Sequence, residues 1–126
     1  MATESKWDES IVFDSTHFRD FTEGDPYLET DVLSIFIENA PTYLEALKSA
    51  GPGEWRTCAH KLKGAARSIG AWNLAREAER AEHRNTLGLD DPDRNVFIQE
   101  LHARLETLIR VLEDEILPDI ARKTAS

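Results

Sequence analysis

Long apolar runs, cysteine pairs and low-complexity linkers are all missing from this chain of 126 residues. Its one cysteine, Cys58, cannot form a disulfide within the chain, so nothing requires an oxidising compartment. No apolar run approaches the roughly 20 residues that span a membrane. The polar, acidic start of the chain (Met1–Ser10) lacks the apolar core of a signal peptide. We therefore expect a cytoplasmic protein that does not act at a membrane.

Basic residues are scarce as well. The chain has 15 lysines and arginines against 24 acidic residues, which gives a net charge of -9. A general nucleic-acid binder needs a basic surface, so this balance argues against nucleic acid as a partner. One stretch differs from the rest, because Trp55 to Arg76 contains five basic residues and no acidic one. This stretch predicts a local positive surface.

Strand patterns are also absent, since no segment alternates apolar and polar residues with a period of two. Apolar residues recur at helical spacing through most of the chain. The sequence therefore predicts an all-α fold, an antiparallel four-helix bundle with a short additional N-terminal helix. We expect this domain over residues 14–120, preceded by a flexible segment at 1–13 and followed by a C-terminal tail at 121–126.

Capping residues, prolines and glycines mark the ends of the predicted helices. The expected segments are a short helix from Asp14 or Ser15 to Gly24, a second from Asp25 and Pro26 to about Ser49, a third from Gly51 to about Ile69, a fourth over roughly Trp72–Thr86, and a last, longest helix that Asp90–Asp93 opens. Two prolines disturb this pattern. Pro41 should kink the second helix or break its hydrogen bonding locally, and Pro118 should limit or bend the last.

The second predicted helix has a broad apolar arc. The stripe expected to face the core consists of Leu28, Val32, Ile35, Phe36, Tyr43 and Leu47. An adjoining strip carries Leu33, Ile37 and Leu44, and two interpretations of it stay open. In the first, the short first helix covers part of the strip with Phe18 and Phe21. In the second, the strip is an exposed docking surface. The first helix and a docking partner can also share this surface. The docking residues that we predict are Leu33, Ile37, Phe18 and Phe21.

One histidine of the third predicted helix is surrounded by cations. At about 100° per residue, Arg56, Lys63, Gly64 and Arg67 all fall within roughly 60° of His60. The apolar residues of this helix lie on its opposite side. His60 is therefore predicted to point away from the core.

This arrangement fits a histidine that carries a phosphoryl group. Nucleophilic attack needs a neutral imidazole, and nearby cations disfavour the imidazolium form. The same cations would then face the dianionic phosphoryl group, each contact contributing about 1 kcal/mol while solvated. A mid-helix glycine costs about 0.5–1 kcal/mol relative to alanine. The missing side chain of Gly64 would let a partner approach beside the imidazole.

The residues around His60 also carry a family resemblance. The segment AHKLKGAA at 59–66, followed by SIG at 68–70 and by Leu74, resembles the signature of histidine-containing phosphotransfer (HPt) domains. The segments GDP at 24–26 and IFIENAP at 35–41 resemble the helix that precedes the active one in that family. H-x-L-K-G with the downstream glycine is a specific pattern, although Ala65 stands where many members have serine. The resemblance covers roughly residues 14–117.

The resemblance implies a phosphorelay carrier. His60 would accept a phosphoryl group from the aspartate of one response-regulator receiver domain and donate it to another, with Lys63 assisting the phosphoryl group and Gly64 giving access. Arg56 and Arg67 would support the site. The implied partners are receiver domains, including one of a hybrid histidine kinase. The receiver domain, and not this chain, would hold the Mg²⁺. We expect a monomer without metal or cofactor, and not an enzyme by itself, since no nucleotide-binding motif is present.

Two other classes of protein compete with this interpretation. The first is a non-catalytic helical adaptor that binds a partner through an apolar patch, with His60 incidental. The second is a metal-binding bundle, for which Glu79 and His83 supply one pair a helical turn apart but no second pair is evident. We expect His17, His83 and His102 to be ordinary surface histidines.

Overall fold

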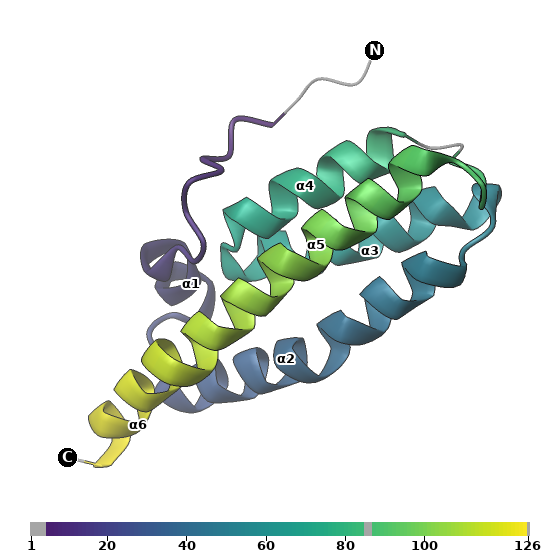
Figure 1. Ribbon diagram of the computed structural model, residues 1–126. Coiled ribbons are helices and arrows are strands. Elements are labelled where there is room, and N and C mark those ends of the chain that lie inside the picture. Colours follow the sequence, from purple (N-terminus) through teal and green to yellow (C-terminus); the bar gives the residue numbers. More distant parts are fainter. Residues whose placement is uncertain (1–4, 85–86, 126) are drawn as a thin grey trace.

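The computed structural model describes residues 5–84 and 87–125, and over these residues the chain forms helices and no strands (Figure 1). The elements are α1 (Ser15–Thr22), α2 (Pro26–Ser49), α3 (Pro52–Ile69), α4 (Trp72–His83), α5 (Pro92–Val111), the π-helix η1 (Leu112–Ile116) and α6 (Leu117–Ala125). Helix α3 packs against α2 and α4, and α5 packs against the same two helices. The predicted all-α class is confirmed, and α2 to α5 run antiparallel to their neighbours in the chain, with α1 against α2 and α3.

The predicted boundaries of the first three helices are confirmed, because their caps form as expected. The carboxylate of Asp14 accepts a hydrogen bond from the His17 N–H, and that of Asp25 accepts from the first turn of α2. Gly70 ends α3 with φ of 82°, a left-handed conformation. A Cβ at Gly70 would lie 3.0 Å from the carbonyl oxygen of Asp14, so this position needs glycine for space as well as for conformation.

The later boundaries differ from the prediction. Helix α4 ends at His83, and the predicted end at Thr86 lies outside the described residues. Within α2, whose ends are as predicted, the helix continues past Pro41, and the kink expected there stays a prediction. Pro118 does not end the last helix either, which continues to Ala125, beyond the domain boundary expected at 120.

A wider turn accommodates Pro118. Because proline has no N–H, it cannot donate to the carbonyl four residues before it. At the end of η1, one residue before the proline, the N–H of Leu117 donates to the carbonyl of Leu112, five residues back. This π-type turn lets the chain pass the proline and remain helical.

The core face of α2 is rotated from the predicted one. Its buried residues include Leu33, Phe36, Ala40, Leu44 and Leu47, whereas Ile35 is 57% exposed and Leu28 is also exposed. Leu33 is fully buried and Phe18 is buried in the same core, so the prediction that these two residues dock a partner is wrong. Phe36 and Leu47 of the predicted stripe are buried as expected, together with Leu33 and Leu44 of the adjoining strip. Both strips are apolar, so the sequence of α2 alone does not say which of their residues the other helices cover.

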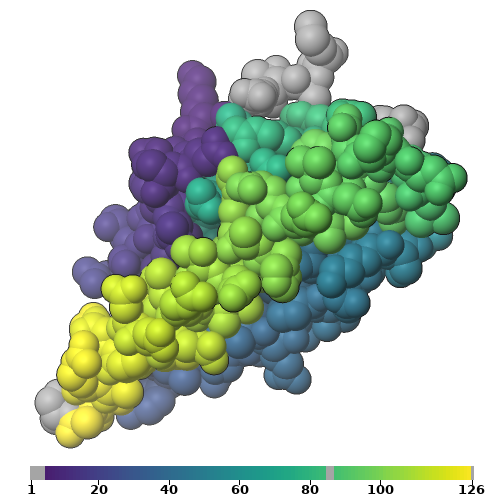
Figure 2. Space-filling view, in the orientation of Figure 1, coloured from purple at the N-terminus to yellow at the C-terminus, as the bar shows by residue number. Residues whose placement is uncertain are grey.

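The N-terminal segment is not free. Residues 5–14, which we call the strap, lie along α4. The expectation of a flexible segment over 1–13 is therefore wrong for residues 5–13, and residues 1–4 lie outside the described part. Trp7 stacks on Trp72 with ring centroids 5.5 Å apart. Glu9 forms ion pairs of 2.6 Å with both Arg80 and Arg104. In the space-filling view, the purple N-terminal residues adjoin the teal and green surface of α4 and α5 (Figure 2).

Across the described residues, none of the helices combines the length and the apolar character that crossing a membrane would need.

Candidate functional site

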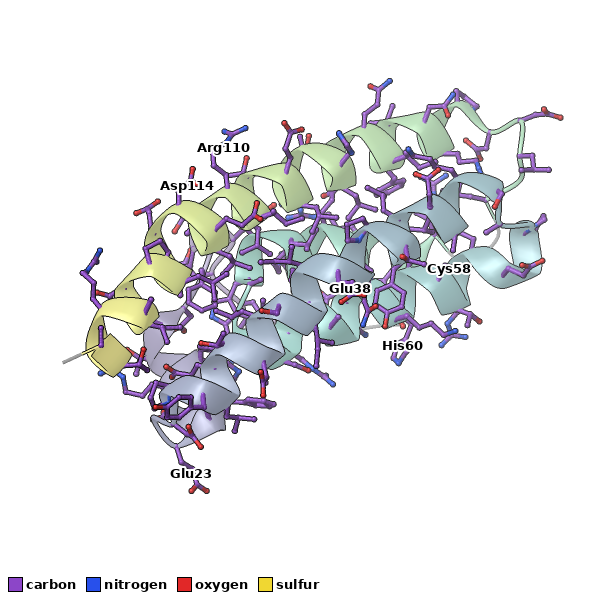
Figure 3. All side chains as sticks on the ribbon, turned by 90° about the horizontal axis from the view of Figure 1, so that it is seen from below. Glu23, Glu38, Cys58, His60, Arg110 and Asp114 are labelled. Atoms are coloured by element: carbon purple, nitrogen blue, oxygen red, sulfur yellow. The ribbon has the colours of Figure 1, made fainter. Side chains whose placement is uncertain are left out.

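Helix α3 presents His60 to solvent because its opposite face is the core. Its buried residues are Trp55, Ala59, Leu62, Ala66 and Ile69, which recur at helical spacing. The His60 side chain is 63% exposed and projects outward from the bundle (Figure 3). The predicted orientation of this histidine is therefore confirmed.

A buried carboxylate from the next helix holds the imidazole. The Nδ1 atom of His60 lies 2.8 Å from Oε1 of Glu82 in α4, and the Glu82 side chain is only 9% exposed. An ionised carboxylate can only accept hydrogen bonds, so Nδ1 carries the proton and donates a hydrogen bond to Glu82. The lone pair of the neutral ring is then on Nε2, which is the nucleophilic atom of this tautomer.

Glu82 also pairs with Lys63. The Lys63 Nζ lies 2.6 Å from Oε2 of Glu82, and the lysine side chain is 15% exposed. At this distance the ammonium and the carboxylate form a close ion pair. Burial by itself would raise the pKa of Glu82, but the contacts with Lys63 and His60 outweigh it and lower that pKa below its ordinary value. Glu82 is therefore an anion that bridges the two predicted site residues.

The sequence analysis missed Glu82, which lies 22 residues from His60. A signal for it was present, because α3 and α4 form an antiparallel pair joined at Gly70 and Ala71. Residues at similar distances from such a turn come side by side. His60 precedes Gly70 by ten residues and Glu82 follows Ala71 by eleven.

The two predicted supporting arginines are placed differently. Arg56 lines a shallow groove together with Thr57, His60 and Glu82, so it belongs to the immediate surroundings of the imidazole. Arg67 is exposed on α3 but does not line this groove. Within residues 5–84 and 87–125 neither guanidinium has an ion-pair partner. Both are therefore free to meet an incoming acidic group.

Open space lies beside the site at Gly64. A Cβ built on this glycine meets nothing within 4 Å, so neither φ nor packing in the free protein requires glycine here. Next to it, α2 and α3 form a small apolar groove. Its lining residues are Val32, Ile35, Phe36, Asn39, Ala40, Tyr43, Ala65, Ser68 and Ile69. A partner that reaches His60 past Gly64 would meet this groove.

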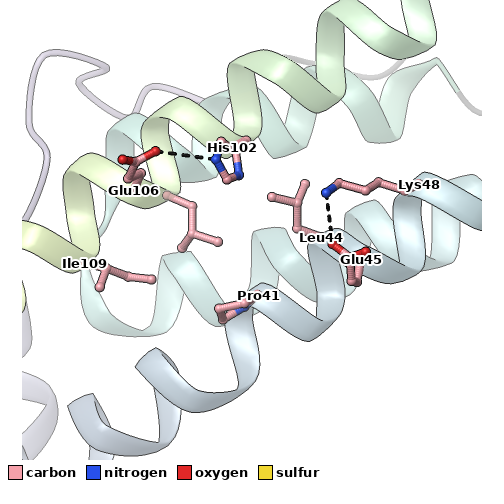
Figure 4. Close-up of a pocket in the computed structure, with 8 residues that line it drawn as sticks. Pro41, Leu44, Glu45, Lys48, His102, Glu106 and Ile109 are labelled. Atoms are coloured by element: carbon pink, nitrogen blue, oxygen red, sulfur yellow. Dashed lines mark ion pairs between the residues drawn. The ribbon is translucent and has the colours of Figure 1, made fainter.

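A larger groove lies elsewhere, between α2 and α5 (Figure 4). Its floor is apolar. Its rim carries an ion pair of Lys48 with Glu45 at 2.9 Å, and the His102 ring lies 3.4 Å from the Glu106 carboxylate, a contact that is an ion pair when the ring is protonated. No residue of α3 lines it. This groove is separate from His60, and its lysine is already paired with Glu45.

The other predicted surface histidines have ordinary surroundings. The His17 ring meets the edge of Trp72 with centroids 4.8 Å apart, and His83 is exposed at the end of α4. Glu79, the other half of the possible metal pair, instead forms an ion pair with Arg76 at 2.9 Å.

One known family model covers the part of the chain that carries this site. The model of the Hpt domain matches residues 31–96, which is just over half of the 126 residues and includes His60, Lys63, Gly64 and Glu82. Searches of curated proteins and of solved structures gave no match.

Proposed function

Since the chain belongs to the Hpt domain family, we propose that it is the carrier of a multistep phosphorelay that accepts a phosphoryl group on Nε2 of His60. The donor is the phosphorylated aspartate of one receiver domain, and the acceptor is the aspartate of another. The observation that carries this proposal is the exposed imidazole whose Nδ1 is held by a buried carboxylate at 2.8 Å.

The chemistry follows from the tautomer. The Nε2 lone pair attacks the phosphorus of the aspartyl phosphate, the N–P bond forms, and the P–O bond to the aspartate breaks with its electron pair on the carboxylate. The ring then carries a positive charge, with the proton still on Nδ1. The Glu82 carboxylate stabilises this charge, as a carboxylate behind a histidine does in other nucleophilic sites. Transfer to the second receiver reverses these steps.

Lys63 and Gly64 have different roles in this reaction: Lys63 balances charge, and Gly64 leaves space for the receiver. The Lys63 ammonium is one helical turn from His60 and balances the negative charge of Glu82 before transfer. A dianionic phosphoryl group on Nε2 competes with Glu82 for the same ammonium. The space at Gly64 admits the active-site loops of the receiver. Catalysis and Mg²⁺ belong to the receiver in this proposal, so the chain is a carrier and not an enzyme by itself.

The receiver docks beside the imidazole on α2 and α3. Ile35 is exposed and lines the small apolar groove next to Gly64, together with the half-buried Val32 and Tyr43. Arg56 and Arg67 extend along α3 without an ion-pair partner in the described part of the chain, and they complement the acidic phosphorylation site of a receiver. Of the four docking residues predicted from the sequence, Ile37 is half-buried and Phe21 is exposed, so these two stay candidates. We propose a monomer that works in the cytoplasm, where one receiver of a hybrid histidine kinase is the donor.

The test is transfer of labelled phosphate from a phosphorylated receiver. We expect a label that is stable in base and labile in acid, which His60→Gln abolishes without changing helicity or melting temperature. His17→Gln, His83→Gln and His102→Gln are the matched controls and should retain the label. Label that persists in His60→Gln would remove the proposal. A receiver that binds but transfers no label would favour the adaptor instead.

A further inference from the structure

Helix α4 carries Glu82 and packs on α3, but its own sequence does little to stabilise its first turn. It has 12 residues, a length at which isolated helices are marginal in water. Its N-cap is Ala71, which supplies no side-chain hydrogen bond, and its first turn has no acidic residue. Its buried apolar positions are Leu74 and three alanines, which provide little apolar area.

The strap supplies the missing cap. The backbone N–H of Asn73, in the first turn of α4, donates to the carbonyl of Ile11 at 2.8 Å. The Asn73 side chain donates to the carbonyl of Glu9, also at 2.8 Å. The indole N–H of Trp72 donates to the Asp14 carboxylate at 2.9 Å. Groups of the strap thus satisfy donors of the first turn that no residue of α4 itself caps.

The strap also ties the outer face of α4 to α5. The Glu9 carboxylate accepts two hydrogen bonds from Arg80 of α4 and one from Arg104 of α5, each 2.6 Å long. Hydrogen bonds from these two guanidinium groups lower the pKa of Glu9 to about 2, so the link stays charged at neutral pH. At the other end of the strap, the Ser5 hydroxyl donates to Glu79, one helical turn before Glu82.

From these contacts we infer that the strap is a positioning element of the phosphotransfer site. By capping α4 and tying it to α5 through Glu9, the strap holds the Glu82 carboxylate against Nδ1 of His60. Glu9 is the central positioning residue, since its one side chain joins the strap, α4 and α5. This inference rests on the proposed function for its consequence in transfer, but the position of α4 can be measured without it.

The experiment compares the full chain with Glu9→Gln and with the double variant Trp7→Ala/Glu9→Gln. The matched control is Glu100→Gln, which removes another ion pair of Arg104, 2.8 Å long, without touching the strap or α4. Amide hydrogen exchange reports the local stability of α4, and ¹⁵N spectra of the His60 imidazole report its tautomer. The initial rate of transfer from a phosphorylated receiver is the third measurement.

In Glu9→Gln we expect the amides of α4 to exchange about tenfold faster relative to those of α2, with a larger effect in the double variant. The fraction of His60 with the proton on Nδ1 should fall, and transfer should slow by about the same factor as that fraction. Glu100→Gln should change none of the three. Unchanged exchange in α4 would overturn the inference. Faster exchange with an unchanged His60 tautomer would also overturn it, because the strap would then stabilise α4 without positioning Glu82. If the unmodified chain receives no phosphate, the proposed function fails, while exchange and tautomer still decide this inference.

Discussion

Glu82→Gln changes the partner of His60 from an acceptor to a group that can also donate. The glutamine amide can donate to Nδ1, which moves the ring proton to Nε2 and removes the nucleophilic lone pair from the exposed nitrogen. Glu82→Ala removes the partner altogether and leaves the two tautomers to compete in water. Both changes also leave the largely buried Lys63 without its counterion.

The expected loss of transfer rate follows from the hydrogen bond between His60 and Glu82. A hydrogen bond to a charged group contributes about 1.5–3 kcal/mol. Because the imidazole is 63% exposed and water competes for it, we take the lower end of this range. About 1.5 kcal/mol corresponds to roughly a tenfold loss in transfer rate for Glu82→Ala. Glu82→Gln should lose at least as much, since its amide stabilises the unreactive tautomer.

Two measurements check this expectation. Initial rates are measured with an excess of phosphorylated receiver, and long-range ¹H–¹⁵N spectra identify which ring nitrogen is protonated. The unmodified chain should show the proton on Nδ1, and Glu82→Gln should show it largely on Nε2. If Glu82→Gln retains both the tautomer and the rate, the role assigned to Glu82 is wrong. A loss of rate without a change in tautomer would mean that Glu82 acts through Lys63.

Three further predictions concern access, docking and acid stability. Gly64→Ala should keep or raise stability by up to about 1 kcal/mol through helix propensity. Gly64→Leu should slow transfer and spare the fold, and an unchanged transfer rate in this variant would contradict the argument that Gly64 gives the receiver access. Ile35→Glu should weaken receiver binding, measured by calorimetry, with little effect on melting temperature. Leu33→Ala should cost about 2–5 kcal/mol of stability, and its folded fraction should bind the receiver normally. The opposite pattern would place docking on the strip of Leu33. The pKa of Glu9 is lowered from 4.5 to about 2, so its contribution to stability is present above pH 4.5 and is lost as the pH falls toward 2. With its side chain about a third exposed, this contribution is about 1 kcal/mol after screening, and acid unfolding curves of Glu9→Gln should lack it.

The sequence alone determined the helical class, most helix boundaries and the exposure of His60. These features depend on local physics: apolar spacing along one helix, side-chain caps at Asp14 and Asp25, and the left-handed conformation that Gly70 adopts. The groups on the His60 side of α3 follow from the same periodicity, so Lys63 and Gly64 could be placed before any tertiary contact was known.

Only the tertiary structure decided which partners these elements have. The two apolar strips of α2 have similar composition, and packing against the other helices buried Phe36 and Leu47 of one strip together with Leu33 and Leu44 of the other. Glu82 reaches His60 because α3 and α4 fold back on each other. The strap is ordered by contacts of Glu9 with Arg80 and Arg104, which are 71 and 95 residues away. Such pairings join residues far apart in the chain, and no periodicity within a single segment records them.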